Sequence, residues 1–323
     1  GRGGEGRMKG GRWSLAAVLA LHAAAVLVFT QGFFLAREEL PNRSPCQASQ
    51  PGGPKGAPCA PLERDQRFDK VVLVVIDALR TDFVCDAGQT TEGAEPLGHE
   101  FRLPSLVRLA RQHAPSDAQL FHFLADAPTT TTQRLKGLAS GTLATFTDIL
   151  TSLHASDVGE DSWVEQMVRH GWRLRFMGDD TWTKLFPTAF ARHTSYPSFD
   201  IKDLDTVDDG IIPELMSAAS DDDDWDLLVA HFLGVDHAGH TFDVGSAEMR
   251  RKLSQMDAAM AELVSRLEAR EGRRKEEGKG TLLLVMGDHG QTYTGEHGGD
   301  SYEEVSTAML AYAVRASRPS IPS

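Results

Sequence analysis

The sequence predicts an α/β domain with a largely parallel sheet that is covered by helices on both faces. Four short apolar runs are typical of buried strands, at residues 71–76, 174–177, 227–233 and 281–286. Segments with helical spacing lie between these runs, and such alternation favours a parallel sheet. The chain has 323 residues and a hydrophobic content of 41%, which is enough for one large domain with a full core.

The N-terminal segment is long and apolar enough to cross a membrane. Residues 13–36 contain no charged side chain and consist mainly of Ala, Leu, Val and Phe. At about 1.5 Å per residue, a helix of this length spans a hydrocarbon core of about 30 Å. Basic residues precede the segment, so the positive-inside rule predicts a cytosolic tail at residues 1–12 and a single-pass anchor. A cleaved signal peptide is the alternative, although its apolar region usually has only about 7 to 15 residues.

Residues 37–66 are expected to form a flexible tether that leads to a globular domain at residues 67–315. The tether is rich in Pro, Gly and Ser and lacks apolar periodicity. Two of the three cysteines, Cys46 and Cys59, lie in it. In an oxidising compartment they could pair, which would leave Cys85 alone, but three cysteines in so long a chain do not make a disulfide scaffold.

The clearest predicted helix covers residues 247–269, where Met and Leu recur at steps of three and four among charged and polar side chains. Shorter helices are expected at residues 104–113 and 161–170. In the second of these, Asp161 is expected as the N-cap and Gly171 lies just past the end. The formal net charge is −13, and no basic stripe compensates it, which argues against a nucleic-acid partner.

Three of the predicted strands lead to carboxylates. The run at residues 71–76 is followed directly by Asp77, and two later runs lead within a few residues to Asp236 and Asp288. In open α/β sheets, ligands bind beyond the carboxyl ends of the strands, so we expect these acids to meet at one edge. Three histidines follow in the same segments: His240, His289 and His297.

These acids and histidines together predict a metal site. Alone, an Asp at a strand end is more often a helix cap or a turn former. Acids that gather at one edge need a counter-charge, since like charges raise one another's pKa and oppose folding. Asp and His without Cys suit Zn²⁺, with Mn²⁺ as the alternative where oxygen ligands dominate. Six ligands exceed the need of one catalytic zinc and predict two ions, which stabilise the attacking and leaving oxygens at phosphorus.

A run of threonines in residues 127–141, "APTTTTQRLKGLASG", offers a nucleophile. The hydroxyl groups follow a proline and precede a helix-like segment. Helix-terminal N–H groups and a metal would both stabilise an alkoxide at this position. Without the metal ligands, a β-branched loop or an N-cap run would be the simpler interpretation.

Six stretches together resemble the ethanolamine phosphate transferases of glycosylphosphatidylinositol (GPI) synthesis, above all the third transferase type. They are "VVLVVIDALRTDF", "PTTTTQRLKGL", "FMGDDTW", "PSFDIKDLDTVDDGI", "AHFLGVDHAGH" and "GDHGQTYTGEHGGD". The alkaline phosphatase superfamily shares the metal ligands but lacks "FMGDDTW" and "DLDTVDDGI". The resemblance implies an alkaline-phosphatase-like α/β/α sandwich in the lumen of the endoplasmic reticulum. The implied reaction moves ethanolamine phosphate from phosphatidylethanolamine to a mannose of the GPI glycan.

The resemblance also assigns the site residues. One zinc is expected at Asp236, His240 and His297, and the other at Asp77, Asp288, His289 and the nucleophilic threonine. The spacing P-T-x-T of related phosphodiesterases in the superfamily implies Thr131 as the nucleophile, with Thr130 as the alternative. The family tends to carry a larger apolar residue where Thr132 stands, and this departure leaves the choice between the threonines open. Four further residues are expected near the substrate: Asp179, Asp180, His237 and Asp300.

The resemblance implies several partners. These are a phosphatidylethanolamine donor, a mannosylated GPI precursor with its third mannose as acceptor, the lipid bilayer, and a small stabilising membrane subunit. Family members continue into a region with many membrane spans, so residues 316–323 are expected to be a truncated tail before that region. Two other functions compete: a metal-dependent phosphodiesterase or nucleotide pyrophosphatase-like hydrolase, and a lumenal domain that binds a glycolipid without turnover.

Overall fold

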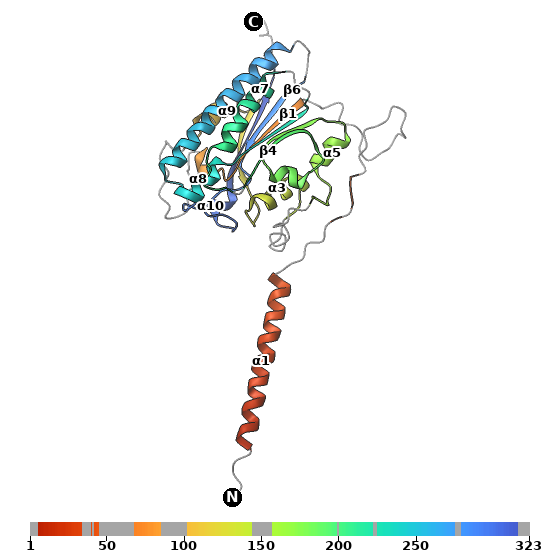
Figure 1. Cartoon of the computed structure of the whole chain (residues 1–323), viewed down its shortest axis with the longest axis vertical. Helices are drawn as coiled ribbons and strands as arrows, with labels where there is room; N and C mark the ends of the chain where they lie inside the picture. The colour runs from red at the N-terminus through yellow and green to blue at the C-terminus, as the bar shows by residue number, and fades with distance from the viewer. Residues whose placement is uncertain are drawn as a thin grey trace, which may run out of the picture.

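The computed structural model describes residues 6–33, 40, 42–44, 68–84, 102–143, 157–198, 200–221, 225–274 and 279–315. In these ranges a seven-stranded sheet lies between two layers of helices (Figure 1). The predicted α/β class with a covered, mostly parallel sheet is therefore confirmed. All three cysteines, the tail at residues 316–323 and most of the predicted tether lie outside the described residues.

The sheet has the strand order β2-β7-β6-β1-β5-β3-β4. Its strands are β1 (Phe68–Ile76), β2 (Ala118–Leu124), β3 (Leu174–Asp179), β4 (Phe190–Tyr196), β5 (Leu227–Phe232), β6 (Gly280–Met286) and β7 (Ser306–Val314). Strand β1 pairs in parallel with β5 and β6, and β3 pairs in parallel with β4 and β5. Strand β7 runs antiparallel to both β6 and β2. The four predicted strand runs correspond to β1, β3, β5 and β6.

Helices cover both faces of this sheet. They are α2 (Pro104–His113), α3 (Thr131–Ser140), α5 (Trp163–Arg169), α6 (Thr181–Leu185), α7 (Thr206–Ser220), α8 (Gly234–Phe242), α9 (Ala247–Arg273) and α10 (Tyr302–Val305), with a short 3₁₀ turn η2 (Thr81–Phe83). Helices α7, α8 and α9 lie on one side, and α3 and α5 lie on the other (Figure 1). Alternate residues of β1 point to opposite faces of the sheet. Val72 and Val74 pack in the hydrophobic core on one face, and Leu73 and Val75 pack in the core on the other face. Burial on both faces explains why this strand is an unbroken apolar run.

For the helix predicted at residues 161–170, observed as α5, the structure agrees with the predicted C-terminal end but not with the predicted N-cap. Residue Gly171 follows the second short helix with a left-handed φ of +79°, as expected of a residue at that position. The prediction of Asp161 as the N-cap was wrong, because Ser162 takes that position and accepts a hydrogen bond from the Glu165 N–H at 3.2 Å. The carboxylate of Asp161 instead accepts from the side-chain amide of Gln166 at 2.7 and 2.9 Å.

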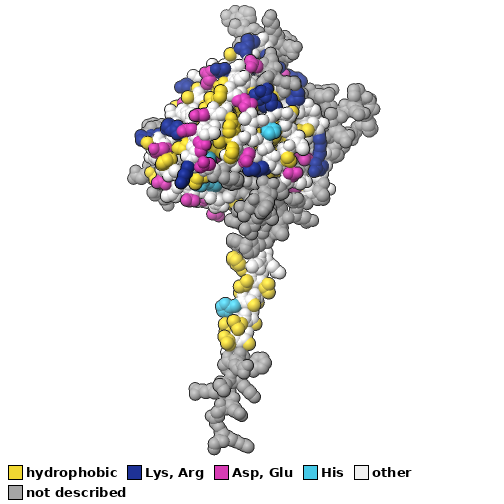
Figure 2. Space-filling view, viewed as in Figure 1, with side chains coloured by type: hydrophobic (Ala, Val, Ile, Leu, Met, Phe, Trp, Pro, Cys, Tyr) yellow, Lys and Arg dark blue, Asp and Glu magenta, His cyan; other side chains and the backbone are white. Residues whose placement is uncertain are grey.

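Helix α1 (Gly6–Phe33) is a long apolar helix at the N-terminal end. Its segment Ser14–Gly32 has a mean hydropathy of 1.9 and is long and apolar enough to cross a membrane. Nearly all of its described side chains are exposed, and Figure 2 shows hydrophobic groups along its surface. These features support the predicted anchor, although a signal sequence would share them.

Strand β3 approaches β5 too closely at Gly178 for any side chain. This glycine has a φ of +135°, and an added Cβ would lie 2.2 Å from the carbonyl oxygen of His231. We expect Gly178→Ala to lower the free energy of unfolding by about 2 to 4 kcal/mol, since both strain and overlap oppose the methyl group.

Denaturation in urea would measure this loss. The matched control is Gly171→Ala, which also has a positive φ but has no atom within 4 Å of the added methyl group. It should cost only about 1 kcal/mol. Equal losses in the two variants would contradict the close approach of β3 and β5.

Candidate metal centre

The three predicted acids lie at the carboxyl ends of the central strands β1, β5 and β6. The residue directly after β1 is Asp77, Asp288 follows β6 after one glycine, and Asp236 lies in the first turn of α8 after β5. All three carboxylates are buried, at 2%, 2% and 7% exposure respectively. The structure therefore brings together at one edge the acids that the sequence placed there.

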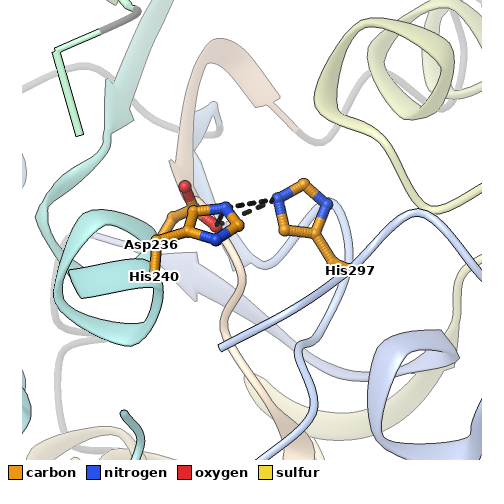
Figure 3. Close-up of side chains that lie close together, drawn as sticks. All are labelled: Asp236, His240 and His297. Carbon is orange, nitrogen blue, oxygen red and sulfur yellow. Dashed lines mark hydrogen bonds and ion pairs between the residues drawn. The ribbon is translucent and has the colours of Figure 1, made fainter. Parts of the chain in front are cut away.

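The first cluster consists of Asp236, His240 and His297, whose ligand atoms all lie within 4.8 Å of one another (Figure 3). Helix α8 presents Asp236 and His240 on the same face, because residues four apart are neighbours on a helix. The loop after β6 supplies His297. The Nε2 atoms of the two histidines lie 2.9 Å apart, and both are within 3.4 Å of the same Asp236 oxygen. Three donor atoms thus converge on one small volume.

The second cluster consists of Asp77, Asp288 and His289. The Nε2 atom of His289 lies 3.3 Å from Asp77 Oδ1 and 3.5 Å from Asp288 Oδ2. The ring of His289 stacks on that of His297 with 4.1 Å between centroids, so the two clusters are adjacent. One more residue comes close: the ligand atoms of His231, Asp77 and Asp288 also lie within 4.8 Å of one another.

Backbone carbonyls orient two of the imidazoles. The Nδ1–H of His289 donates to the Gly290 carbonyl at 2.9 Å, and the Nδ1–H of His297 donates to the Thr129 carbonyl at 2.8 Å. A carbonyl oxygen only accepts, so in a neutral ring the lone pair is left on Nε2. Such hydrogen bonds fix the tautomer and the ring orientation of metal-binding histidines. When neutral, both histidines therefore direct an acceptor nitrogen into the clusters.

The charges in the two clusters shift pKa values in opposite directions. Burial, followed by the nearby carboxylates of Asp288 and Asp236, raises the pKa of Asp77 well above its usual value. Burial also disfavours the charged form of Asp236, but its interaction with His297, whose Nε2 lies 3.3 Å from Asp236 Oδ1, outweighs this and lowers the pKa of Asp236 to about 2. The pKa of His297 rises to about 9 in spite of burial, because Asp236 stabilises its cation.

Several buried oxygens at the site have no hydrogen-bond partner among the described residues. They are Asp77 Oδ1, Asp236 Oδ1 and Asp288 Oδ2. Unpaired buried carboxylate oxygens are costly to fold, and a bound cation removes that cost. The donor set of carboxylate oxygens and imidazole nitrogens, without sulfur, fits Zn²⁺. Because His297 would be protonated at neutral pH without metal, binding of a cation there must displace a proton.

The threonine run lies beside the second cluster at the start of α3. The Oγ1 atom of Thr131, the first helical residue, lies 3.4 Å from both Asp77 Oδ2 and His289 Nε2. The Thr130 hydroxyl instead donates to the side chain of Gln133 on the same helix. Of these two candidate nucleophiles, Thr131 is therefore the one whose hydroxyl contacts the cluster.

Thr129 connects the threonine run to the loop that carries His297. Its hydroxyl donates to the Gly299 carbonyl and accepts from the Gly298 N–H, both at 2.9 Å, and its side chain is fully buried. This role of Thr129 was not predicted from the sequence. The contacts join backbone groups about 170 residues away in the chain, and no spacing within the run indicates them.

The four residues expected near the substrate have different contacts. Asp179 is buried and accepts two hydrogen bonds from Thr181. Asp180 binds the ammonium group of Lys184 at 2.6 Å. The buried His237 donates from Nδ1 to a backbone carbonyl at 2.8 Å, and Asp300 is exposed. Their contacts with substrate remain predictions.

The sequence of the domain matches a known family. Residues 122–314, more than half of the chain, match the type I phosphodiesterase / nucleotide pyrophosphatase family. The fold agrees with this match. The C-terminal periplasmic domain of EcEptC from Escherichia coli, solved in complex with Zn, superposes with a TM-score of 0.52 at 12% identity, over 76% of this chain and 73% of that one.

Two human proteins are similar in sequence to nearly the whole chain. The catalytic subunit of GPI ethanolamine phosphate transferase 3 is 44% identical over 95% of this chain. The catalytic subunit of GPI ethanolamine phosphate transferase 2 is 34% identical over 90% of it. In both comparisons the chain spans 28% of the relative's length. The chain therefore belongs to the type I phosphodiesterase / nucleotide pyrophosphatase family and is a homologue of GPI ethanolamine phosphate transferase 3.

Proposed function

We propose that this domain transfers ethanolamine phosphate from phosphatidylethanolamine to a mannose of the GPI glycan. The observation that carries the proposal is the Thr131 hydroxyl, which lies at the N-terminus of α3 and 3.4 Å from both a carboxylate and an imidazole of the second cluster. The names of the relatives supply the transferred ethanolamine phosphate and the GPI acceptor, and the sequence resemblance supplies phosphatidylethanolamine and the mannose. The third mannose is proposed because identity is 44% to the third transferase against 34% to the second, in agreement with the resemblance to the third type.

We further propose that two Zn²⁺ ions occupy the site. The first cluster, Asp236, His240 and His297, would hold one ion, and Asp77, Asp288 and His289 would hold the other. Zinc in a solved structure of the same fold supports this choice, and Mn²⁺ is the alternative. When bound, the ions would supply Lewis-acid stabilisation of negative charge on the oxygens around phosphorus.

With Thr131 as the nucleophile, the transfer takes place in two successive substitutions at phosphorus. In the first, Thr131 Oγ bonds to phosphorus, the bond from phosphorus to the diacylglycerol oxygen breaks, and the departing alcohol takes up a proton in place of the one that threonine loses. In the second, a mannose hydroxyl bonds to phosphorus and the bond to Thr131 breaks. The threonine hydroxyl is then restored, so the cycle consumes no net proton.

The proposed location is the membrane of the endoplasmic reticulum, with the domain in the lumen and α1 as the anchor. Basic residues before an apolar helix favour a cytosolic N-terminus. Phosphatidylethanolamine and the GPI precursor are both bilayer lipids, so an anchored domain meets them at the surface. A small stabilising membrane subunit is a further proposed partner, and the relatives' description as catalytic subunits supports it.

Product analysis tests the proposal directly. The purified chain in detergent, with zinc, would receive phosphatidylethanolamine and a mannosylated GPI precursor, and mass spectrometry would follow the products. Modified glycan supports transfer. Free ethanolamine phosphate would support the hydrolase, the second candidate, which the phosphodiesterase family match favours. Glycolipid binding without either product would support a binding domain.

Metal analysis tests the two-ion site. We expect about two zinc ions per wild-type chain and about one in Asp236→Ala, because this variant removes the carboxylate shared by both histidines of the first cluster. Zinc would be measured by atomic emission after dialysis. The control Asp221→Ala removes an exposed carboxylate and should leave the count unchanged. An unchanged count in Asp236→Ala would exclude the proposed ligand.

A further inference from the structure

The buried His231 has no role in the proposed reaction, although it lies against the second cluster. It sits within β5 with 0% exposure. Its Nδ1 atom accepts a hydrogen bond from the Trp182 indole N–H at 3.1 Å and lies 3.6 Å from Asp179 Oδ2. Its Nε2 atom lies 3.7 Å from Asp77 Oδ2 and has no hydrogen-bond partner among the described residues.

These contacts fix the tautomer of His231. An indole N–H group only donates, so the Nδ1 lone pair is occupied. A neutral imidazole carries one proton, which must then be on Nε2, where it faces the Asp77 carboxylate. A nitrogen that carries a proton has no lone pair for a metal. The neutral ring therefore cannot be a ligand through Nε2 in this arrangement.

The hydrogen-bond donor is itself held rigidly. The fully buried indole of Trp182 packs against Phe176, Phe186 and Phe190, with ring centroids 6.2 to 6.3 Å apart. A buried indole N–H needs an acceptor, and His231 Nδ1 is the one it has among the described residues. The aromatic cluster thus keeps the N–H directed at the imidazole.

We propose that His231 is a positioning residue, which Trp182 holds as the Nε2–H tautomer so that its proton orients the Asp77 carboxylate. The separation of 3.7 Å makes this contact electrostatic, since it exceeds a hydrogen bond. The interaction engages Asp77 Oδ2 and leaves Oδ1 directed at His289 Nε2, 3.3 Å away. The inference rests on the proposed zinc site.

The competing role is that of a direct ligand, and the two roles predict opposite effects of Trp182→Phe. A ligand must bind through a deprotonated Nε2, which moves the proton to Nδ1, where it opposes the indole N–H. Loss of the indole would then strengthen zinc binding. A positioning histidine needs the indole, so its loss should weaken zinc binding.

The experiment measures zinc in the full chain by competition with a chromophoric chelator. We expect His231→Gln, whose amide N–H can replace the imidazole donor, to bind two ions with affinity within about threefold of wild type. We expect His231→Leu and Trp182→Phe to weaken one of the two ions by about 10- to 100-fold, the usual range for such outer groups. Thermal unfolding of the metal-free variants would identify loss of the fold.

A ligand role would give other results and would overturn the inference: one ion in both His231 variants, with binding in Trp182→Phe equal to or tighter than wild type. The ¹⁵N NMR spectrum of His231 in the metal-free chain reports the tautomer directly, and a proton on Nδ1 would also overturn the inference. A wild-type chain that binds no zinc would instead overturn the zinc site, and the spectrum alone would then decide the tautomer.

Discussion

Thr131→Ala is expected to lower the rate of ethanolamine phosphate transfer by about a thousandfold or more. The substitution removes the proposed nucleophile, and the remaining groups can only bind and orient the lipid phosphate. Zinc content should stay near two ions, because Asp77, His289 and the first cluster are unchanged. The rate would be measured by mass spectrometry with phosphatidylethanolamine and a mannosylated GPI precursor.

Two matched variants make this prediction specific. Thr131→Ser keeps the hydroxyl group and should retain activity within about tenfold of wild type. The hydroxyl of Thr130 donates along the helix to Gln133, so Thr130→Ala should transfer at a rate within about threefold of wild type and lose about 1 kcal/mol of stability at most. If Thr130→Ala were inactive and Thr131→Ala active, the nucleophile would be reassigned to Thr130.

The intermediate provides a second readout of the same variants. Without the GPI precursor, wild-type chain and phosphatidylethanolamine should yield protein that carries ethanolamine phosphate on the peptide containing Thr131. The modified peptide should be absent from Thr131→Ala and present in Thr130→Ala. Turnover without any modified protein in the wild type would favour direct displacement by the acceptor.

The parts of the sheet that could be predicted from sequence are those buried on both faces. The central strands read as apolar runs because neither face meets water. The strands β2 and β4 at the two edges of the sheet expose much of their length, and their polar residues interrupt the pattern. Strand β7 alternates buried and half-buried residues and continues directly from α10. Residues 308–314 of this strand are all apolar, but three of the seven are alanine, which is depleted in strands, so the run does not stand out as a strand.

Some residues of the site could likewise be predicted from sequence, and others could not. The acids could be predicted because a carboxylate that ends an apolar strand departs from what folding alone requires. His231 was missed because a single histidine inside an apolar strand reads as a core residue. The one sequence signal was that His231 is the single polar side chain in the apolar run at residues 227–233. Its partner Trp182 is about 50 residues away in the chain, and local sequence carries no sign of that contact.

A buried ion pair at the start of α8 connects three helices. The ammonium group of Lys252 on α9 lies 2.7 Å from Asp208 Oδ2 on α7, and both side chains have 0% exposure. The other oxygen of Asp208 accepts from the N–H groups of Leu233 and Gly234 at 3.0 and 3.2 Å, where α8 begins. Helix α8 carries Asp236, so this carboxylate fixes the entry of the helix that supplies the first cluster.

Lys252→Met is expected to lower the free energy of unfolding by about 3 to 5 kcal/mol, because it leaves the Asp208 carboxylate buried without its counter-charge. The matched control is the neighbouring Arg251→Met. Arg251 forms a half-exposed pair with Asp205 at 2.9 Å, and such pairs contribute about 1 kcal/mol or less. The double variant Asp208→Asn with Lys252→Met removes both charges and keeps an acceptor for α8, so it should recover much of the loss.

The loss in Lys252→Met should depend on pH. Burial already raises the pKa of Asp208, and Lys252 opposes that rise. Without the lysine, the pKa of Asp208 in the folded state rises further above its value in the unfolded state. The folded state then keeps a proton on Asp208 that the unfolded state releases. Stability relative to wild type should therefore fall as the pH rises above about 4 and be lower at pH about 7.5 than at pH about 5. Urea denaturation of the metal-free proteins at both pH values would measure this difference. If Lys252→Met lost as little free energy of unfolding as Arg251→Met at both pH values, α8 would not depend on the buried pair.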